Sequence, residues 1–329
     1  MQMSVIVPAR NASTTLGACL KGIRAALTED AEVILVDDYS SDSTSDIAKQ
    51  YADHVESLLA HKGLANARNI GKKIARGKHI IFVDSDVIVP KDVFIKIEYC
   101  FKRHPDVYAV TGLLSKEHPN RDFFSQYKNL YMHFIFKNQQ DPIQFLYGSI
   151  HAFREKPAVD YDVSMRYAED TAMGMELSHA GKKIMLMKDL EVVHLKRHNL
   201  LSLIRNDFNI SFYWARLFLR YQRSGQLLRH GPGFAHAPTN QILSIITAPI
   251  ILFFGILYFF EPQYLALLIS ATAAWVYWNW RFFLFLYLEK RGLFALMAAI
   301  WTYIDHMIMS TAVLFGGLFG ILGGNLKRS

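Results

Sequence analysis

Charged side chains are scarce in the last third of the chain. Residues 240–324 hold six Asp, Glu, Lys or Arg residues, whereas these four types make up 20% of all 329 residues. Such a stretch excludes a fully soluble protein and an intrinsically disordered one. Three apolar runs fill it, at 242–260, 264–288 and 293–322, each long enough to cross a bilayer at about 20 residues per span. We therefore expect a transmembrane region of two or three helices.

Cysteine is almost absent as well, with two residues in the whole chain. Cys19 and Cys100 lie far apart, which excludes a disulfide scaffold and favours two small core residues in a reducing compartment. We also expect no signal peptide, because the apolar run at residues 4–8 is shorter than a signal-peptide core of roughly 7–15 residues. We expect a multi-pass protein of the inner or plasma membrane whose N-terminal part is cytoplasmic.

Positive charge is concentrated just before the apolar region. Residues 197–230 hold six Arg and one acidic residue, within a net charge of +7 for the chain. This pattern predicts a helix over 200–223 that lies in the membrane interface and faces anionic lipid rather than nucleic acid. The alternative is a helix packed against the soluble domain. Inside the third run, Asp305 and His306 are functional candidates, or a structural pair that involves Arg281.

Short apolar runs alternate with helical patterns over the first 195 residues. This alternation is typical of an α/β fold with a mainly parallel sheet. The last two strands are expected to be short and separate, at 184–187 and 191–193. The predicted domains are an α/β domain at 1–196, a basic interface helix and linker at 197–238, a transmembrane region at 239–324 and a basic tail at 325–329.

Acidic residues directly follow two predicted strands, where open α/β sheets bind ligands. Asp84 and Asp86, with Ser85 between them, can both turn to one divalent cation. Mg²⁺ and Mn²⁺ take carboxylate oxygens and often bridge to a diphosphate. The alternative is turn capping by Asp86. Asp37 and Asp38 can hydrogen-bond a nucleobase or ribose, or cap the next helix.

Two helix starts carry further polar groups. The run GLANARNIG, which begins at Gly63, offers backbone amides and Arg68 to a diphosphate. Glu169 and Asp170 begin another helix, where carboxylates interact favourably with the helix dipole. One of them is alternatively a general base for an acceptor hydroxyl. His194 ends a strand and is either structural or a third metal ligand.

Six segments, taken in order, resemble the glycosyltransferases of family 2, which have the GT-A fold. They are SVIVPARN, ILVDDYSSDST, KGLANARNIGKKIARGKHIIFVDSD, YGSIHAFRE, YAEDTAMGMELSHAGKKI and VVH, within residues 3–195. The resemblance implies a metal-dependent enzyme that moves a sugar from a nucleoside-diphosphate sugar to an acceptor, with inversion at the anomeric carbon.

The resemblance also implies roles for individual residues. The nucleotide sugar would be held by Pro8, Ala9, Arg10, Asp37, Asp38, Gly63, Arg68, Asn69, Asp84 and Ser85. Mg²⁺ or Mn²⁺ would be bound by Asp84, Asp86 and His194. The catalytic pair would be Asp170, as the base, and its neighbour Glu169.

Two departures from the family pattern refine this interpretation. Arg10 and Asn11 stand where the family often has Asn-Glu, which affects contacts to the base or ribose. The Gln-x-x-Arg-Trp signature of processive synthases is missing, which favours transfer of a single sugar.

The expected donor is most often a UDP-sugar in this family. The expected acceptor is a lipid or lipid-linked hydroxyl group, as in cell-envelope glycolipid or polysaccharide synthesis. A polyprenyl-phosphate sugar synthase, whose phosphate acceptor needs no base, is the first alternative. A non-catalytic membrane scaffold that binds nucleotide sugars is the second, and no nucleic-acid partner is expected.

Overall fold

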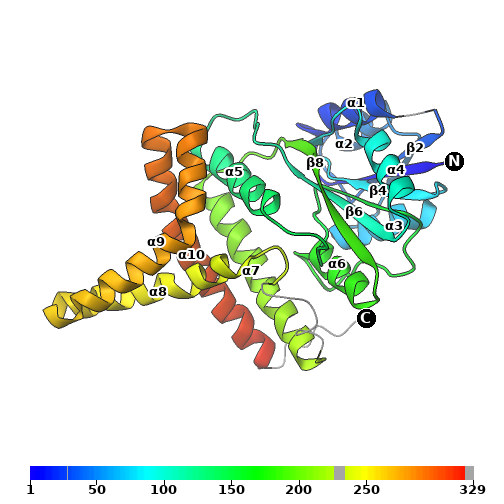
Figure 1. Cartoon of the computed structure of the whole chain (residues 1–329). Coiled ribbons are helices and arrows are strands. Elements are labelled where there is room, and N and C mark those ends of the chain that lie inside the picture. The colour runs from blue at the N-terminus through cyan, green and yellow to red at the C-terminus, as the bar shows by residue number, and fades with distance from the viewer. Residues whose placement is uncertain (28, 226–233, 323–329) are drawn as a thin grey trace. The chain divides into compact units, whose positions relative to one another are not determined.

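The computed structural model describes residues 1–27, 29–225 and 234–322 (Figure 1). The chain separates after Arg197 into two compact units, an N-terminal unit and a second unit that begins at His198. Part of the predicted linker, at 226–233, and the predicted basic tail at 325–329 lie outside the described residues.

The N-terminal unit alternates strands and helices in the way that the sequence pattern predicts. Its strands are β1 (Met3–Ala9), β2 (Ala31–Asp37), β3 (His54–Ser57), β4 (His79–Val83), β5 (Val87–Ile88), β6 (Val107–Leu114), β7 (Ile150–Phe153) and β8 (Lys183–His194). Its helices are α1 (Leu16–Ala26), α2 (Thr44–Ala48), α3 (Leu64–Ile74), α4 (Val93–Arg103), α5 (Phe123–Lys137) and α6 (Glu169–His179).

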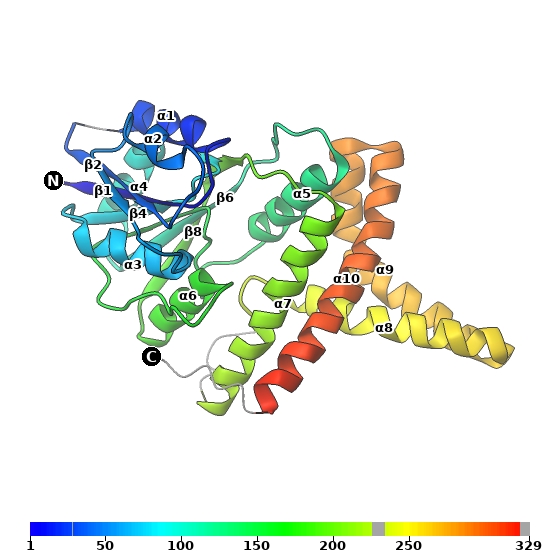
Figure 2. The ribbon, with the colours of Figure 1, turned by 180° about the vertical axis from the view of Figure 1, so that it is seen from behind.

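The eight strands form one sheet in the order β3-β2-β1-β4-β7-β6-β8-β5. Strands β7 and β5 are antiparallel to their neighbours, and the other strands run in one direction. Helices α1 and α3 lie on opposite sides of this sheet (Figures 1 and 2). The predicted α/β fold with a mainly parallel sheet is confirmed.

One strand prediction was wrong. The segments 184–187 and 191–193 are not separate, because both belong to β8. Strand β8 pairs in parallel with β6 on both sides of an irregularity between Thr111 and Leu113. The shift in register accommodates the polar residues 188 and 189, which interrupt the apolar pattern in the sequence.

The centre of the sheet explains how α3 is placed. Strands β1 and β4 are buried at every position, because helices cover both faces of the sheet. Helix α3 packs closely on β1 at Gly71, where an added Cβ would lie 2.3 Å from the Ile6 side chain. This close packing fixes the N-terminal turns of α3, which carry Arg68, at the carboxyl ends of the strands.

The second unit is helical over most of its described residues. It comprises α7 (Leu200–Arg223), α8 (Thr239–Phe260), a short 3₁₀ turn (Pro262–Tyr264), α9 (Leu265–Lys290) and α10 (Gly292–Ile321). Two of these helices, α8 and α10, are long and apolar enough to cross a membrane by length and composition. The second predicted apolar run forms α9.

Helix α7 runs beside α10 in both views (Figures 1 and 2). The rings of Phe212 and Phe319 lie 6.0 Å apart, and the Arg223 guanidinium donates to the Gly320 carbonyl at 3.2 Å. The predicted basic helix therefore has an apolar helix of its own unit as a packing partner. Its location in a membrane interface stays a prediction.

Polar side chains are buried where α9 meets α10. The Trp275 indole donates to Nδ1 of His306 at 3.1 Å, and both residues are buried, as is Asp305. His306 thus has a packing and hydrogen-bonding role inside this helical unit. A functional role for the Asp305–His306 pair stays a prediction.

Candidate active site

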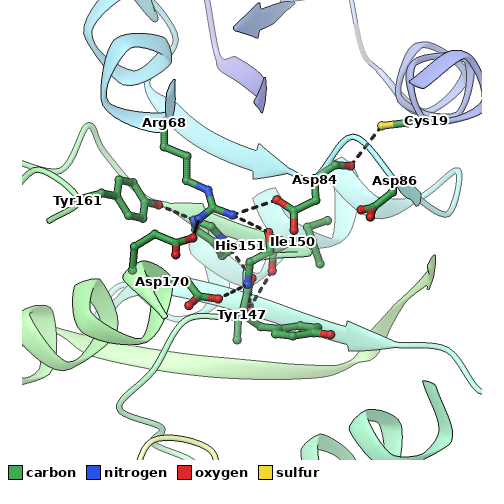
Figure 3. Close-up of polar contacts among 12 residues, drawn as sticks. Cys19, Arg68, Asp84, Asp86, Tyr147, Ile150, His151, Tyr161 and Asp170 are labelled. Carbon is green, nitrogen blue, oxygen red and sulfur yellow. Dashed lines mark hydrogen bonds and ion pairs between the residues drawn. The ribbon is translucent and has the colours of Figure 1, made fainter. Parts of the chain in front are cut away.

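A buried arginine joins the predicted donor side and the predicted acceptor side of the site. Arg68 projects from α3, and its Nη2 donates to Oδ1 of Asp84 at 2.9 Å, just past the end of β4. Its Nη1 pairs with Oε1 of Glu169, at the start of α6. Arg68 is almost fully buried, so these two carboxylates balance its charge within the unit. Figure 3 shows the Arg68 guanidinium next to the Asp84 carboxylate.

Arg68 is supported by a second layer of contacts from the segment before α6. The Tyr161 ring lies 5.5 Å from the guanidinium carbon, and its hydroxyl hydrogen-bonds Nε2 of His151 at 2.5 Å. The Asn69 side chain exchanges two hydrogen bonds with the Tyr161 backbone, at 2.8 and 2.9 Å. Lys72 binds the carbonyl groups of 157 and 159, so α3 holds this loop in place along its length.

Gly148 is the point at which the two sides of the site meet. Its N–H donates to Oδ2 of Asp170 at 2.7 Å. A Cβ added at Gly148 would lie 3.1 Å from Arg68 Nη2, 3.1 Å from Asp170 Oδ2 and 3.3 Å from Asp84 Oδ2. The absence of a side chain at this position therefore lets carboxylates from β4 and α6 approach one small space.

Asp86 lies beside His194 because of local strand pairing. Strand β5 begins one residue after Asp86 and pairs with the end of β8, with Val87 opposite His194. The His194 Nε2 atom is 3.4 Å from Oδ2 of Asp86. Two of the three predicted metal ligands thus face one another, while one oxygen of the third, Asp84, is paired with Arg68.

The carboxylates of the site differ in how strongly they hold a proton. Burial raises the pKa of Asp84 to about 6, although Arg68 opposes this effect. Burial likewise raises the pKa of Asp170, against Arg68 and the N–H groups of Thr171 and Gly148. At Asp86 burial is outweighed by His194, which lowers the pKa to about 2. Asp86 is therefore a stable anion, whereas Asp170 accepts a proton more readily than an exposed aspartate.

The donor set suits a hard divalent cation only in part. Carboxylate oxygens from Asp84 and Asp86, with one imidazole, are ligands that Mn²⁺ and Mg²⁺ accept. Across the described ranges, however, no group of three or more His, Cys, Asp or Glu side chains is arranged to hold a metal ion. The free oxygen of Asp84 and the Asp86–His194 pair fit a cation that also has ligands from a bound diphosphate. The three-residue metal set stays a prediction.

Asp38, which follows β2, holds the loop that leads into α3. Asp38 accepts from the backbone N–H groups of Lys62 and Gly63, at 2.7 and 2.8 Å, and is 2.7 Å from Nδ1 of His61. Asp37 accepts from the Ser40 N–H at 3.0 Å and shapes the turn that follows β2. Both aspartates are buried, and a role in base recognition stays a prediction.

The remaining predicted nucleotide residues lie along the same edge. Pro8 and Ala9 end β1, opposite Val36 and Asp37 of β2. Arg10 follows them and is exposed, and Ser85 is half-buried between the two aspartates of the β4 end.

Several residues of the site were missed from sequence. His61 next to Asp38, Gly148 between the carboxylates, and the His151–Tyr161 pair belong to it by contact. Gly148 and Ser149 interrupt the apolar pattern of the sequence around them. The sequence does not indicate that two carboxylates meet at Gly148. Tyr161 lies in an irregular loop, for which periodicity gives no signal.

Comparisons with known proteins place the sequence and the fold among glycosyltransferases. The sequence of residues 4–161 matches the family model described as Glycosyl transferase family 2. One relative is UDP-Glc:alpha-D-GlcNAc-diphosphoundecaprenol beta-1,3-glucosyltransferase WfaP of Escherichia coli, which is 26% identical to this chain over 187 residues. The aligned region covers 55% of this chain and 62% of that protein. It is 33% identical over 104 residues to poly(ribitol-phosphate) beta-glucosyltransferase of Bacillus spizizenii, which covers 29% of this chain and 16% of the relative. The matches thus span less than two thirds of either relative.

A solved structure has the same fold. It is the mannosyltransferase PcManGT of Pyrobaculum calidifontis, in complex with GDP-Man and Mn²⁺. The TM-score is 0.58 at 17% identity, over 98% of this chain and 88% of that one. The likeness confirms the GT-A fold predicted from the sequence.

Proposed function

Because residues 4–161 belong to glycosyl transferase family 2, we propose that this chain transfers one sugar from a nucleoside-diphosphate sugar to a lipid-linked hydroxyl group at a membrane surface. The observation that carries the proposal is the convergence at Gly148. Asp84, on the predicted donor side, and Asp170, on the predicted acceptor side, each have an oxygen within 3.3 Å of the point where a Cβ at Gly148 would stand, so the two carboxylates lie close together beside this residue. Sugar transfer requires the donor and the acceptor to be held next to one another, and carboxylates from both sides stand together here.

Asp170 is the residue we assign as the general base. It takes the proton of the acceptor hydroxyl while that oxygen forms its bond to C1 of the sugar. The bond between C1 and the diphosphate oxygen breaks on the opposite face, the anomeric configuration inverts, and the nucleoside diphosphate leaves. The Gly148 and Thr171 N–H groups hold the carboxylate at 2.7 and 2.6 Å, and its raised pKa favours proton uptake.

Asp84 and Asp86, with His194, are the residues that would hold Mg²⁺ or Mn²⁺. A divalent cation supplies charge stabilisation to the departing diphosphate when it is bound. The solved mannosyltransferase of the same fold is in complex with Mn²⁺ and GDP-Man, which supports a divalent cation in the proposed reaction. Arg68 keeps Asp84 and Glu169 in place, so Glu169 acts through Arg68 as a positioning residue.

The acceptor is proposed from the second unit and from the relatives. The α8 and α10 helices have the length and apolar composition of membrane spans, and α8 exposes large apolar residues such as Phe253 and Phe259. The names of the relatives cite an undecaprenol-linked acceptor and a poly(ribitol-phosphate) acceptor, both of them cell-envelope glycans or their precursors. We propose a UDP-sugar as donor on the same basis, and a multi-pass protein with its catalytic unit in the cytoplasm.

The base assignment is tested with Asp170→Asn in the full chain. This change keeps the shape and one oxygen that can accept from Gly148, but it removes the proton acceptor and turns an NH₂ group, which cannot accept, towards the Thr171 N–H. We expect sugar transfer to fall by about 10²–10⁴-fold while nucleotide binding is retained. Asp106→Asn is the matched control, since Asp106 is 62% exposed and pairs with Lys183 at the start of β8.

The outcome also separates the two kinds of acceptor. A phosphate acceptor is already an anion and needs no base, so largely retained transfer by Asp170→Asn would favour a polyprenyl-phosphate sugar synthase. If the wild-type protein binds nucleotide but transfers no sugar from any donor, the scaffold alternative replaces the enzyme proposal.

A further inference from the structure

A strained aromatic residue stands at the carboxyl end of β2. Tyr39 has a backbone φ of +62°, in the left-handed region that favours glycine. A bulky residue there costs free energy in the folded chain and persists only where the surroundings determine its conformation. The residue type at this position is therefore not explained by the local backbone, which glycine would fit better.

The surroundings do hold the turn firmly. The Tyr39 N–H donates to the Asp37 carbonyl at 2.9 Å, and Asp37 accepts from the Ser40 N–H at 3.0 Å. The turn is also tied to the loop after β1: the Asn11 N–H donates to Ser40 Oγ, and the Ser41 N–H donates to Asn11 Oδ1, each at 2.9 Å. The strained residue thus has a fixed position between two loops at the ligand-binding edge of the sheet.

The Tyr39 side chain has no polar or aromatic partner among the described residues. It is 57% exposed, and among the residues that the structure describes it makes no side-chain hydrogen bond, ion pair or ring contact. Exposure of a large ring in a strained and rigid turn gains nothing for the fold. The backbone that carries the ring is held in place by the hydrogen bonds of the turn, which lowers the ordering cost of binding a ligand.

The chemistry next to Tyr39 indicates which ligand. On one side in sequence is Asp38, which with His61 shapes the loop that leads to the start of α3. Across the tied loops is Arg10, an exposed cation at the end of β1. An exposed aromatic ring that follows Asp38 in sequence, on a turn tied to the loop that follows Arg10, suits a planar heterocycle whose attached phosphates extend towards α3 and β4.

We propose that Tyr39 is the stacking platform for the nucleobase of the donor, and that it sets the affinity for nucleoside diphosphates. The inference rests on the proposed function, since it assigns a contact to the donor of that reaction. Stacking reads the π-face of the base, so Tyr39 contributes to affinity for any nucleobase. The hydrogen-bonding groups around it then contribute the choice among bases.

Binding is measured with the full-length protein in detergent, by calorimetry with UDP, GDP, CDP and dTDP. For the tightest binder, Tyr39→Gly and Tyr39→Ala are expected to weaken affinity by about 5- to 150-fold, the equivalent of stacking one base on an aromatic ring. Tyr39→Phe keeps the ring and is expected to bind within about twofold of wild type. Tyr39→Gly is expected to unfold at an equal or higher temperature, because glycine relieves the strain.

A spectroscopic variant reports the ring contact directly. All five tryptophans lie at residue 214 or beyond, so Tyr39→Trp places the one tryptophan of residues 1–197. Its emission is expected to change on nucleotide binding. Tyr99→Phe, at a 60% exposed residue of α4, is the control for an exposed tyrosine and is expected to bind as wild type.

The results distinguish this inference from the proposed function. If wild type binds a nucleoside diphosphate and Tyr39→Gly binds it equally well, the stacking role is wrong while the donor class stands. An unchanged emission of the Tyr39→Trp variant at saturating nucleotide has the same meaning. If wild type binds none of the four nucleotides, the proposed function fails, and the stacking role fails with it.

Discussion

The centre of the proposed site is defined at the residue scale by the absence of a side chain. Gly148 lets Arg68, Asp84 and Asp170 approach one position from three elements of the N-terminal unit. Arg68 connects the carboxylates on both sides, so each depends on the placement of the other. A small local change there is expected to disturb both the donor and the acceptor sides at once.

Gly148→Ala tests this arrangement. The new methyl group would lie 3.1 Å from Arg68 Nη2 and Asp170 Oδ2, so these groups must move by a few tenths of an ångström. We expect the rate of sugar transfer to fall by up to about 10²-fold, as misplacement of catalytic groups does, with little change in thermal stability. Gly17→Ala is the control, because its Cβ would meet one side chain at 3.9 Å. Full activity of Gly148→Ala would contradict the convergence at this position.

Sequence patterns predicted the polar residues better than their partners. Asp84, Asp86, Glu169 and Asp170 stand next to recognisable strand and helix ends, and chain topology brings these ends together. The partner of Arg68 was not predictable, because Glu169 lies 101 residues further along the chain. Tyr39 was hidden for a different reason: its significance is a backbone angle that residue type does not report.

At the scale of elements, a buried glutamate fastens the centre of the sheet. Glu32 is the second residue of β2 and accepts from Ser4 Oγ of β1 at 2.6 Å. It also accepts from the Arg76 backbone and guanidinium at 2.8–3.0 Å, at the connection between α3 and β4. Burial opposes ionisation, but the hydrogen bonds from Ser4 and Arg76 lower the pKa of Glu32.

Glu32→Gln is therefore expected to lower the free energy of unfolding by about 1–3 kcal/mol at pH 7. Because the pKa of Glu32 is lowered in the folded state, its contribution is present above the unfolded pKa and is lost as the pH falls through the folded value. The difference between wild type and variant should thus shrink below about pH 4.5, near the pKa of a free glutamate. Urea unfolding from pH 3 to 8 measures it, with the half-exposed Glu56→Gln as control. An equal difference at all pH values would count against this role.

The contact between α7 and α10 depends on small residues. A Cβ at Gly316 would lie 2.4 Å from the Phe212 carbonyl oxygen, and one at Gly320 would lie 2.8 Å from Leu219. This spacing of small residues lets two helix backbones approach closely, as in helix pairs within membranes.

Gly316→Val is expected to separate α7 from α10 and to lower the midpoint of thermal unfolding in detergent by several degrees, or about 2–4 °C for each kcal/mol lost. Gly317→Val is a matched control on the next residue, because its added Cβ would meet nothing within 4 Å. Equal midpoints for the two variants would show that the close contact does not contribute to stability.

The order of elements was predictable because each is marked by local periodicity and by turn residues. Strand β8 was divided wrongly, since tertiary pairing with β6 continues through a polar interruption. The partner of α7 could not be predicted either. The apolar face of α7 indicates that one side of the helix is covered, but the sequence does not identify α10 as the element that covers it.

At the scale of the whole molecule, the proposal requires the catalytic unit to face the cytoplasm. Both native cysteines are buried, so the wild-type protein should react little with a membrane-impermeant maleimide. Leu59 is 96% exposed beside the loop that Asp38 holds. We expect Leu59→Cys to be labelled in permeabilised cells or inverted vesicles, but not in intact cells. Labelling in intact cells would contradict the proposed orientation.

The measurement that tests the central claim most directly is sugar transfer in membranes that contain the protein. A panel of radiolabelled nucleotide sugars is added with Mg²⁺ or Mn²⁺, and label is counted in the organic-solvent extract, for wild type, Asp170→Asn and Asp106→Asn. We expect label from one donor, equal for wild type and Asp106→Asn and lower by about 10²–10⁴-fold for Asp170→Asn. Absence of organic-phase label with every donor, from membranes in which the protein binds nucleotide, would contradict a lipid-linked acceptor.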